Sequence, residues 1–412
     1  TSYRKLRMRV TQPYSTAKGK SKNRRILIRK VNRNLSVFLA KTKQSLNMVT
    51  INDITSYLES IAPRQLQENY DNSGLLTGNP KWKVTSVLVT LDCTDKVVEE
   101  AVQQGCNLIV AHHPIIFKGL KKLTGSNYVE RAMITAIKHD IAIYAIHTNL
   151  DNISHGVNKQ IAEKLGLKHL RILSPKKETL IKLVTFVPHA SVQQVLDALH
   201  EAGAGQIGNY KNCSFQTSGT GSFMPTEGSD PYIGTINRVE RVDEARLELI
   251  FPFHLENAIV KALKSSHPYE EVAYYLTKLE NENQEIGAGI IGEIEKPEEP
   301  IEFLKRLKTT MNTACVRHTA PLDTMIKKVA ICGGSGSFLL PKAIATQADV
   351  FVTADFKYHE FFDADGKILI ADIGHYESEQ YTKDLIKDVL SKKFTTFAIN
   401  FSKTITNPIS YL

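Results

Sequence analysis

The sequence predicts a discontinuous α/β core domain with mostly parallel sheets, interrupted by an inserted ferredoxin-like α+β domain. Two observations lead to this prediction. In both halves of the 412-residue chain, apolar segments rich in Val, Ile, Leu and Ala alternate with amphipathic helical segments, which is typical of parallel strands covered by helices. Between the halves, a strand–helix–strand pattern occurs twice in succession, which is typical of a ferredoxin-like module.

Polar linkers set the expected domain boundaries. The segment "SPKKET" precedes the middle pattern and "ENENQE" follows it. We therefore expect a basic, disordered leader at 1–47, the first half of the core at 48–179, the insert at 180–279 and the second half of the core at 280–412.

Each expected strand is an apolar run, and each expected helix is an amphipathic segment. In the first half we expect strands at 84–92, 107–111 and 141–149 and helices at 94–105, 129–140 and 154–166. In the insert we expect strands at 180–188, 245–253 and 272–279, helices at 191–203 and 254–266, and a polar loop at 216–230. In the second half we expect strands at 326–334, 348–355, 367–374 and 394–401 and helices at 339–347 and 378–392. Ser154 is the expected N-cap of its helix and Gly166 the residue after its end.

Charge is distributed unevenly along the chain. Residues 1–47 hold fourteen Lys and Arg and no Asp or Glu, and removing these charges from the net +9 leaves −5 for residues 48–412. The leader has the composition of a transit peptide and could also bind RNA or DNA through phosphates. We favour a solvated tail, because such charge runs are usually solvated and the remaining chain is acidic, which makes a nucleic-acid partner unlikely.

Cysteine content and hydropathy indicate a compartment. The five cysteines form no CxxC pair, which argues against both a disulfide framework and a thiolate zinc site. No run of eighteen apolar residues occurs, so no membrane-spanning helix is expected. We therefore expect a cytoplasmic protein with free thiols.

Two adjacent histidines, His112 and His113, follow the apolar strand "NLIVA". Successive side chains of a strand point to opposite faces, so two imidazoles at the exit of a strand can diverge toward neighbouring points. Pro114 stiffens this exit by restricting the backbone of His113. The pair therefore indicates two metal ions rather than one.

Three more candidate ligands follow other segments of the predicted sheets. Asp151 follows "YAIHTNL", His375 follows "KILIADIG", and Glu379 lies four residues further on, about one helical turn away. In open α/β sheets, ligand sites gather at the carboxyl ends of strands. Three imidazoles and two carboxylates suit two divalent ions such as Zn, Mn, Fe or Ni, and either carboxylate could bridge them.

Structural interpretations remain open for each of these residues. A histidine at a strand end can be a hydrogen-bonded loop residue, and Asp151 can be a turn or capping residue. His147, His155 and His359 lie near the same edge and could support the ligands by hydrogen bonds or act as acid–base groups. Their spacing singles out none of them, and no catalytic residue is assigned.

Two glycine-rich motifs have the spacing of nucleotide- or phosphate-binding loops in part. "GAGIIG" at 287–292 matches the dinucleotide fingerprint but runs into "EIEKPEEP", which cannot form the required helix, so we reject it. "GGSGS" at 333–337 follows a strand and precedes a helix, and its backbone N–H groups could hold an anion.

The segments "AHHPIIF", "AIHTNLDN", "TADFKYHEFFDA" and "DIGHYESE" stand in this order around a module containing "SHPYEEVAYY". In this combination the chain resembles the Ngg-one-interacting-factor-three-like family, whose members carry the name GTP cyclohydrolase 1 type 2 homologue. The resemblance covers Met48 to the C-terminus, and the insert resembles the signalling-protein-like module of longer bacterial members.

The resemblance implies a dinuclear metal site in a discontinuous α/β domain that assembles into a ring-shaped hexamer. The implied ligands are those already reached from the strand ends: His112, His113, Asp151, His375 and Glu379. The family name implies GTP ring opening, and the leader has no counterpart in the family pattern.

Three function hypotheses follow. The first is a dinuclear metal-dependent hydrolase acting on a nucleotide or similar small polar substrate, with GTP as the named candidate. The second is a metal-handling or ligand-sensing protein without turnover, in which His267, Glu270 and Glu271 of "SHPYEEV" could contact a ligand or could simply pack and be solvated. The third is nucleic-acid binding through the leader, against which the acidic core weighs.

Overall fold

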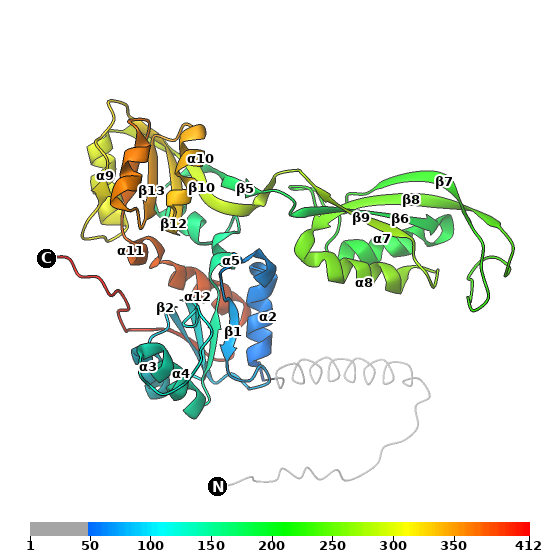
Figure 1. Cartoon of the computed structure of the whole chain (residues 1–412), viewed down its shortest axis with the longest axis horizontal. Coiled ribbons are helices and arrows are strands. Elements are labelled where there is room, and N and C mark those ends of the chain that lie inside the picture. Colours follow the sequence, from blue (N-terminus) through cyan, green and yellow to red (C-terminus); the bar gives the residue numbers. More distant parts are fainter. Residues whose placement is uncertain (1–47) are drawn as a thin grey trace, which may run out of the picture. The chain divides into compact units, whose positions relative to one another are not determined.

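Three sheets organise residues 48–412, which are the residues that the computed structural model describes (Figure 1). The leader predicted at 1–47 lies outside the described residues. Residues 50–412 belong to one compact unit that contains both predicted halves of the core. Among residues 48–412, no helix is both long enough and apolar enough to cross a membrane.

The first sheet has five strands in the order β1-β4-β3-β2-β15. They are β1 (Gly74–Thr77), β2 (Ser86–Asp92), β3 (Leu108–His113), β4 (Ala142–Ala145) and β15 (Ala398–Phe401). The pairs β4–β3, β3–β2 and β2–β15 are parallel, whereas β1 runs antiparallel to β4. Almost every residue of β2, β3 and β4 is buried, which is why these strands read as continuous apolar runs in the sequence.

Helices cover this first sheet. They are α2 (Ile51–Ile61), α3 (Asp95–Gln104), α4 (Tyr128–Lys138) and α12 (Thr382–Lys393). Helices α3 and α4 pack in one apolar cluster with Leu88, Ile109 and Ile143 of the strands. The side chain of Thr94 caps the start of α3, and Gly105 ends it with a φ of 67°, as the sequence predicted.

The second sheet has six strands in the order β11-β14-β13-β12-β10-β5. They are β5 (Lys168–Lys176), β10 (Asn283–Glu298), β11 (Arg317–His318), β12 (Ile326–Ser335), β13 (Val350–Ala354) and β14 (Leu369–Asp372). The pairs β12–β13 and β13–β14 are parallel, and the antiparallel strands β5, β10 and β11 complete the sheet. The predicted α/β class is confirmed, and the rejected "GAGIIG" motif lies inside strand β10.

Helices and short 3₁₀ segments connect these strands. The helices are α5 (Thr148–Asp151), α6 (Val157–Lys164), α9 (Pro300–Thr310), α10 (Leu340–Ala345) and α11 (His375–Glu379). The 3₁₀ segments are η1 (Arg64–Leu66), η2 (His189–Ser191), η3 (Phe253–Leu255), η4 (Ser337–Leu339) and η5 (Tyr358–Ala364). The expected helix at 378–392 is therefore split into the end of α11 and most of α12.

The insert contains a four-stranded antiparallel sheet and two helices. The strands are β6 (Leu180–Pro188), β7 (Phe215–Phe223), β8 (Glu240–Pro252) and β9 (Tyr274–Leu279), in the order β7-β8-β6-β9, and the helices are α7 (Val192–Glu201) and α8 (Glu256–Ser266). This chain order and strand order are those of a ferredoxin-like fold. Its apolar core includes Leu183, Leu247 and Phe251.

The structure corrects two local predictions. Strand β7 occupies most of the expected polar loop at 216–230, because backbone pairing with β8 makes a strand from Gly, Ser and Thr residues whose side chains are largely exposed. Ser154 does not cap a helix, since α6 begins after Gly156 and the Ser154 hydroxyl donates to Glu285 on β10 instead. Gly166, with a φ of 73°, does follow the end of α6 as predicted.

A replacement of the insert tests its independence from the core. Lys176 on β5 and Asn283 on β10 are register partners, so replacing residues 177–282 with Asn-Gly would close β5 and β10 into a hairpin. We expect this variant to keep one cooperative thermal unfolding transition, shifted by less than about 5 °C, because the two core sheets keep all their strands. Circular dichroism would measure the transition, and its disappearance would show that the core needs the insert to fold.

Candidate metal centre

Strand β3 ends at a cluster of histidine and carboxylate side chains, and the neighbouring strand β2 ends beside it. Because β2 and β3 are parallel, Asp92 at the end of β2 lies in register with His113. His112 is fully buried, and its Nδ1 donates a hydrogen bond of 2.8 Å to the Ile146 carbonyl oxygen. A carbonyl only accepts, so the neutral ring presents the lone pair of Nε2, which has no hydrogen-bond partner in the described structure.

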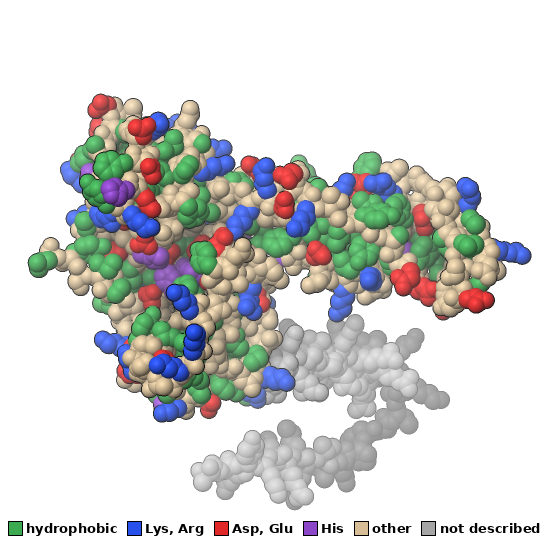
Figure 2. Space-filling model, viewed as in Figure 1, with side chains coloured by type: hydrophobic (Ala, Val, Ile, Leu, Met, Phe, Trp, Pro, Cys, Tyr) green, Lys and Arg blue, Asp and Glu red, His purple; other side chains and the backbone are tan. Residues whose placement is uncertain are grey.

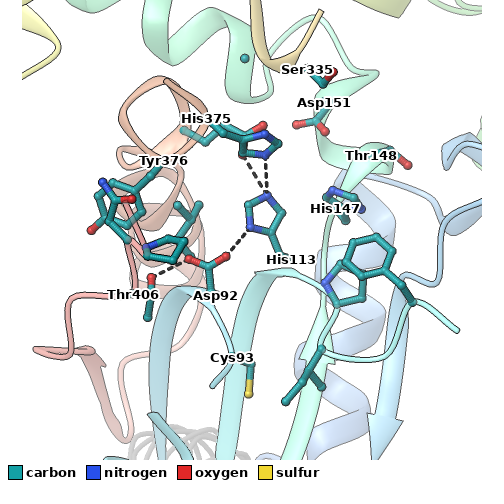
Figure 3. A pocket seen from close by; sticks show the side chains of 18 of the residues that line it. Asp92, Cys93, His113, His147, Thr148, Asp151, Ser335, His375, Tyr376 and Thr406 are labelled. Carbon is teal, nitrogen blue, oxygen red and sulfur yellow. Dashed lines mark hydrogen bonds and ion pairs between the residues drawn. The ribbon is translucent and has the colours of Figure 1, made fainter. Parts of the chain in front are cut away.

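His113 lies between two carboxylates. Its Nδ1 is 2.7 Å from Asp92 Oδ1, as Figure 3 shows. Its Nε2 is 2.9 Å from Glu379 Oε2. Burial lowers the pKa of His113, but the two carboxylates outweigh it and raise that pKa to about 10. Asp92 also accepts a hydrogen bond from the Thr406 hydroxyl. The ring is therefore held by its Nδ1 with its Nε2 facing the cluster.

Helix α11 delivers the other predicted pair, His375 and Glu379, as the four-residue spacing predicted. The Nδ1 of His375 is 2.7 Å from Asp355 Oδ2, and its Nε2 is 3.2 Å from Glu379 Oε2. Glu379 is buried, and although burial raises its pKa, hydrogen bonds from the imidazoles of His113 and His375 hold that pKa well below its ordinary value. Glu379 is thus the carboxylate toward which three imidazoles converge.

Asp151 ends helix α5 and faces the same cluster. Its Oδ1 is buried without a hydrogen-bond partner in the described structure and lies 3.6 Å from His112 Nε2. Burial and the charge of Glu379 both raise the pKa of Asp151. The structure therefore brings all five predicted residues together.

His147 belongs to the same cluster, although the sequence analysis did not single it out as a ligand. Its Nδ1 is 2.8 Å from Asp71 Oδ1, and its ring centroid lies 5.3 Å from that of His112 and 5.2 Å from that of His113. His147 precedes Asp151 by four residues, the same spacing as His375 and Glu379, and this signal could have identified it.

Ligand atoms that could share a metal ion, all within 4.8 Å of one another, form three groups. They are His112, His113 and His147; His113, His375 and Glu379; and His112, Asp151 and Glu379. Glu379 occurs in two groups and Asp151 in one. Neither His155 nor His359 occurs in any of them, within the part of the chain that the structure describes.

The "GGSGS" loop supports the carboxylate rather than presenting an open anion site. The N–H of Gly333 donates to Asn158 Oδ1 and that of Gly334 donates to Ser378 Oγ, so both donors are already engaged. Gly334 has a φ of 63°, and a Cβ there would lie 2.4 Å from Glu379 Oε1. The loop therefore needs glycine because its backbone approaches the Glu379 carboxylate.

These residues fit a bound metal on two grounds. Two buried polar atoms, His112 Nε2 and Asp151 Oδ1, face the cluster unpaired, which is costly without a further partner. Each imidazole also has its Nδ1 fixed by a carbonyl or carboxylate, the arrangement that orients metal-binding histidines. The Nε2 atoms of His113 and His375 are 3.4 Å apart, and both face Glu379 Oε2.

A cavity of about 840 Å³ opens above these side chains. Figure 2 shows histidine side chains gathered beside acidic ones on this face of the molecule. The cavity wall includes the aromatic residues Tyr70, Phe117, Phe338 and Tyr376 and part of the C-terminal segment 404–409. A small molecule in this cavity would therefore reach the histidine–carboxylate cluster directly.

The fold and this cluster define an α/β protein with a histidine–carboxylate site that could bind metal. The model of the family Duf34/NIF3 (NGG1p interacting factor 3) matches residues 49–408, and the chain belongs to this family.

Proteins with similar sequences and a similar solved structure match most of the chain. A GTP cyclohydrolase 1 type 2 homolog of Halalkalibacterium halodurans is 40% identical over 367 residues, which cover 87% of this chain and 98% of the relative. A protein of the same name from Bacillus subtilis is 38% identical over 369 residues, with the same coverage of 87% and 98%. The crystal structure of a Bacillus cereus protein related to NIF3 has a TM-score of 0.78 and 37% identity, covering 89% of this chain and all of the other.

A matched glycine pair tests the close approach of the loop to Glu379. Gly334 and Gly366 have φ values of 63° and 65°, but a Cβ at Gly366 would meet nothing within 4 Å. We expect Gly366→Ala to cost about 1 kcal/mol, from the left-handed backbone alone. Gly334→Ala should cost about 1–3 kcal/mol more, because its Cβ displaces the buried carboxylate. Urea unfolding would measure both, and equal costs would contradict the packing role of Gly334.

Proposed function

We propose that this protein is a dinuclear metal-dependent hydrolase that acts on a nucleotide or similar small polar substrate. The observation that carries the proposal is the fully buried His112, whose Nε2 lone pair faces the cluster without a partner. A structural histidine in such a place would have both ring nitrogens satisfied. An unpaired lone pair opposite two carboxylates is what a divalent cation requires.

The three groups support an assignment of ligands. We assign His112, Asp151 and Glu379 to one ion and His113, His375 and Glu379 to the other, with Glu379 shared. His147 lies beside His112 and His113 and supplements either ion. The nitrogen and oxygen donors suit Zn, Mn, Fe or Ni.

The chain's own residues keep the donors in place for hydrolysis. Asp92, Asp355 and the Ile146 carbonyl hold three imidazoles with their Nε2 atoms directed inward. Protons on His113 and His375 compete with metal, so metal uptake releases protons and weakens as the pH falls. Divalent ions held by these residues would supply a water nucleophile at neutral pH and would stabilise negative charge on a substrate oxygen.

The charges of the side chains that line the cavity indicate which substrates it can accept. Among the described residues that line it, Lys96 is the one Lys or Arg, whereas Glu68, Asp92, Asp95, Asp151 and Glu379 are all acidic. Two divalent ions would add four positive charges, but together with Lys96 these would only offset the five carboxylates, so the cavity would offer little net positive charge to a triphosphate. The aromatic wall and this charge balance favour a small substrate with one phosphate or none over GTP.

A metal-handling protein is the second candidate, favoured by the exposure of one donor. The side chain of His375 is 37% exposed, so an ion bound there could exchange with solvent. A homohexameric ring and a cytoplasmic location remain predictions carried by the family resemblance and the composition. Sedimentation equilibrium of the purified chain would test the ring.

Metal titration of single variants tests the ligand assignment. We expect His112→Ala and His113→Ala each to retain about one ion per chain, because each removes a donor from one ion. Glu379→Gln should lose both ions, since it removes the shared carboxylate. His155→Ala is the matched control and should bind as the unsubstituted chain does. Calorimetry with Zn²⁺ and Mn²⁺ would measure the stoichiometry, and full binding by the His112 and His113 variants would refute the assignment.

A turnover screen tests the substrate class. With both metals bound, we expect kcat/KM for a cyclic mononucleotide or a short phosphodiester to exceed that for GTP ring opening by at least about tenfold, from the charge of the cavity. Glu379→Gln should abolish this activity. Faster turnover of GTP would contradict the charge argument, and metal binding without any turnover would favour the metal-handling candidate.

A further inference from the structure

A second cavity, of about 600 Å³, lies in the insert, and no role has been assigned to it. Helices α7 and α8 cover one face of the four-stranded sheet through residues such as Leu247. Side chains alternate between faces along a strand, so Glu244 and Arg246 of β8 point to the other face, where the cavity lies. Strand β7 with the segment that follows it, Phe186 of β6 and the segment 269–275 supply the remaining walls.

Glu244 is a buried carboxylate without a cationic partner. Its residue is 7% exposed, and its Oε1 accepts a hydrogen bond of 2.8 Å from the Tyr269 hydroxyl. Within residues 48–412, no Lys, Arg or His side chain forms an ion pair with Glu244, and the nearby Arg246 pairs with Glu248 at 2.7 Å. Burying a carboxylate without a positive partner is unfavourable, so this position is suited to a positive charge from outside the chain.

The motif "SHPYEEV" holds Tyr269 against this carboxylate. His267 is buried, and its Nε2 donates to the Phe186 carbonyl oxygen at 2.9 Å, so its Nδ1 is free to accept the Tyr269 N–H at 3.1 Å. Burial lowers the pKa of His267, in agreement with this neutral form. The histidine fixes the backbone of Tyr269, and Tyr269 in turn orients Glu244.

Aromatic rings line the cavity around the carboxylate. The ring of Tyr269 lies 5.9 Å from that of Phe223 and 6.2 Å from that of Tyr232, measured between centroids. Phe186 and Tyr275 form another aromatic pair in the wall, at 6.0 Å. Aromatic faces attract organic cations, and a buried carboxylate beside them adds a charge partner.

Two glycines of β7 face Glu244: Gly219 leaves open space beside it, and Gly221 leaves room for its carboxylate. Gly219 is the register partner of Glu244, and a Cβ there would meet nothing within 4 Å. A Cβ at Gly221 would lie 2.2 Å from Glu244 Oε2. Glycine weakens the interior of a strand and often marks the close approach of a ligand or of another backbone.

We propose that this cavity binds an organic ammonium ligand, whose ammonium group pairs with Glu244 and whose apolar body packs on the rings of Tyr269, Tyr232 and Phe223. The buried carboxylate, the aromatic walls and the open position at Gly219 belong to the insert alone. The proposal is therefore independent of the metal centre.

A matched pair of probes tests the proposal on the full chain. Phenethylamine and 2-phenylethanol have nearly the same shape, but only the first is a cation at neutral pH. We expect saturable binding of the amine, at least about tenfold tighter than that of the alcohol, because the charge partner is buried. Ligand-observed NMR titration would measure both.

Three variants localise the binding. Glu244→Gln should weaken amine binding at least about tenfold and leave alcohol binding unchanged. Glu256→Gln, on helix α8 and outside the cavity, is the matched control and should bind the amine as the unsubstituted chain does. Gly219→Val should block both probes by filling the open space. Equal binding of the two probes, no saturable binding of the amine, or full amine binding by the Glu244 or Gly219 variant would overturn the proposal.

Discussion

The contacts between the buried Glu379 carboxylate and the surrounding imidazoles are the interaction on which the candidate metal centre depends. The Oε2 of Glu379 lies 2.9 Å from His113, 3.2 Å from His375 and 3.9 Å from His112, so one oxygen gathers three imidazoles. His113 ends a strand of the first sheet and lies 266 residues earlier in the chain, whereas His375 follows a strand of the second sheet. A buried charge is tolerated only when donors or cations surround it, so the two sheets must meet at this point.

Much of the core and five residues of the site could be predicted, because buried parallel strands read as apolar runs and their carboxyl ends lie at one edge. His112, His113 and His375 were found in this way. The place of His147 in the cluster was missed, although it precedes Asp151 by four residues; a hydrogen bond to Asp71, in a loop 76 residues away, holds it there. Ser154 was misread as a cap because its hydroxyl pairs with strand β10, a contact that no local pattern encodes.

Strand β7 of the insert is another element that the sequence pattern did not reveal. Strand β7 escaped prediction because Gly, Ser and Thr give no apolar alternation, and only its pairing with β8 makes it a strand. The glycines that hid the strand, such as Gly219, also leave the floor of the second cavity open. Residues that look like a loop in the sequence are therefore those that create room for a ligand.

Anomalous X-ray scattering from crystals of the zinc-loaded protein would test the central claim most directly, because it locates metal without assuming its ligands. The account predicts two zinc peaks in the cavity above β3, one beside His112 Nε2 and one beside His375 Nε2, with the Glu379 carboxylate between them. A single peak, or peaks only outside this cluster, would contradict the dinuclear centre.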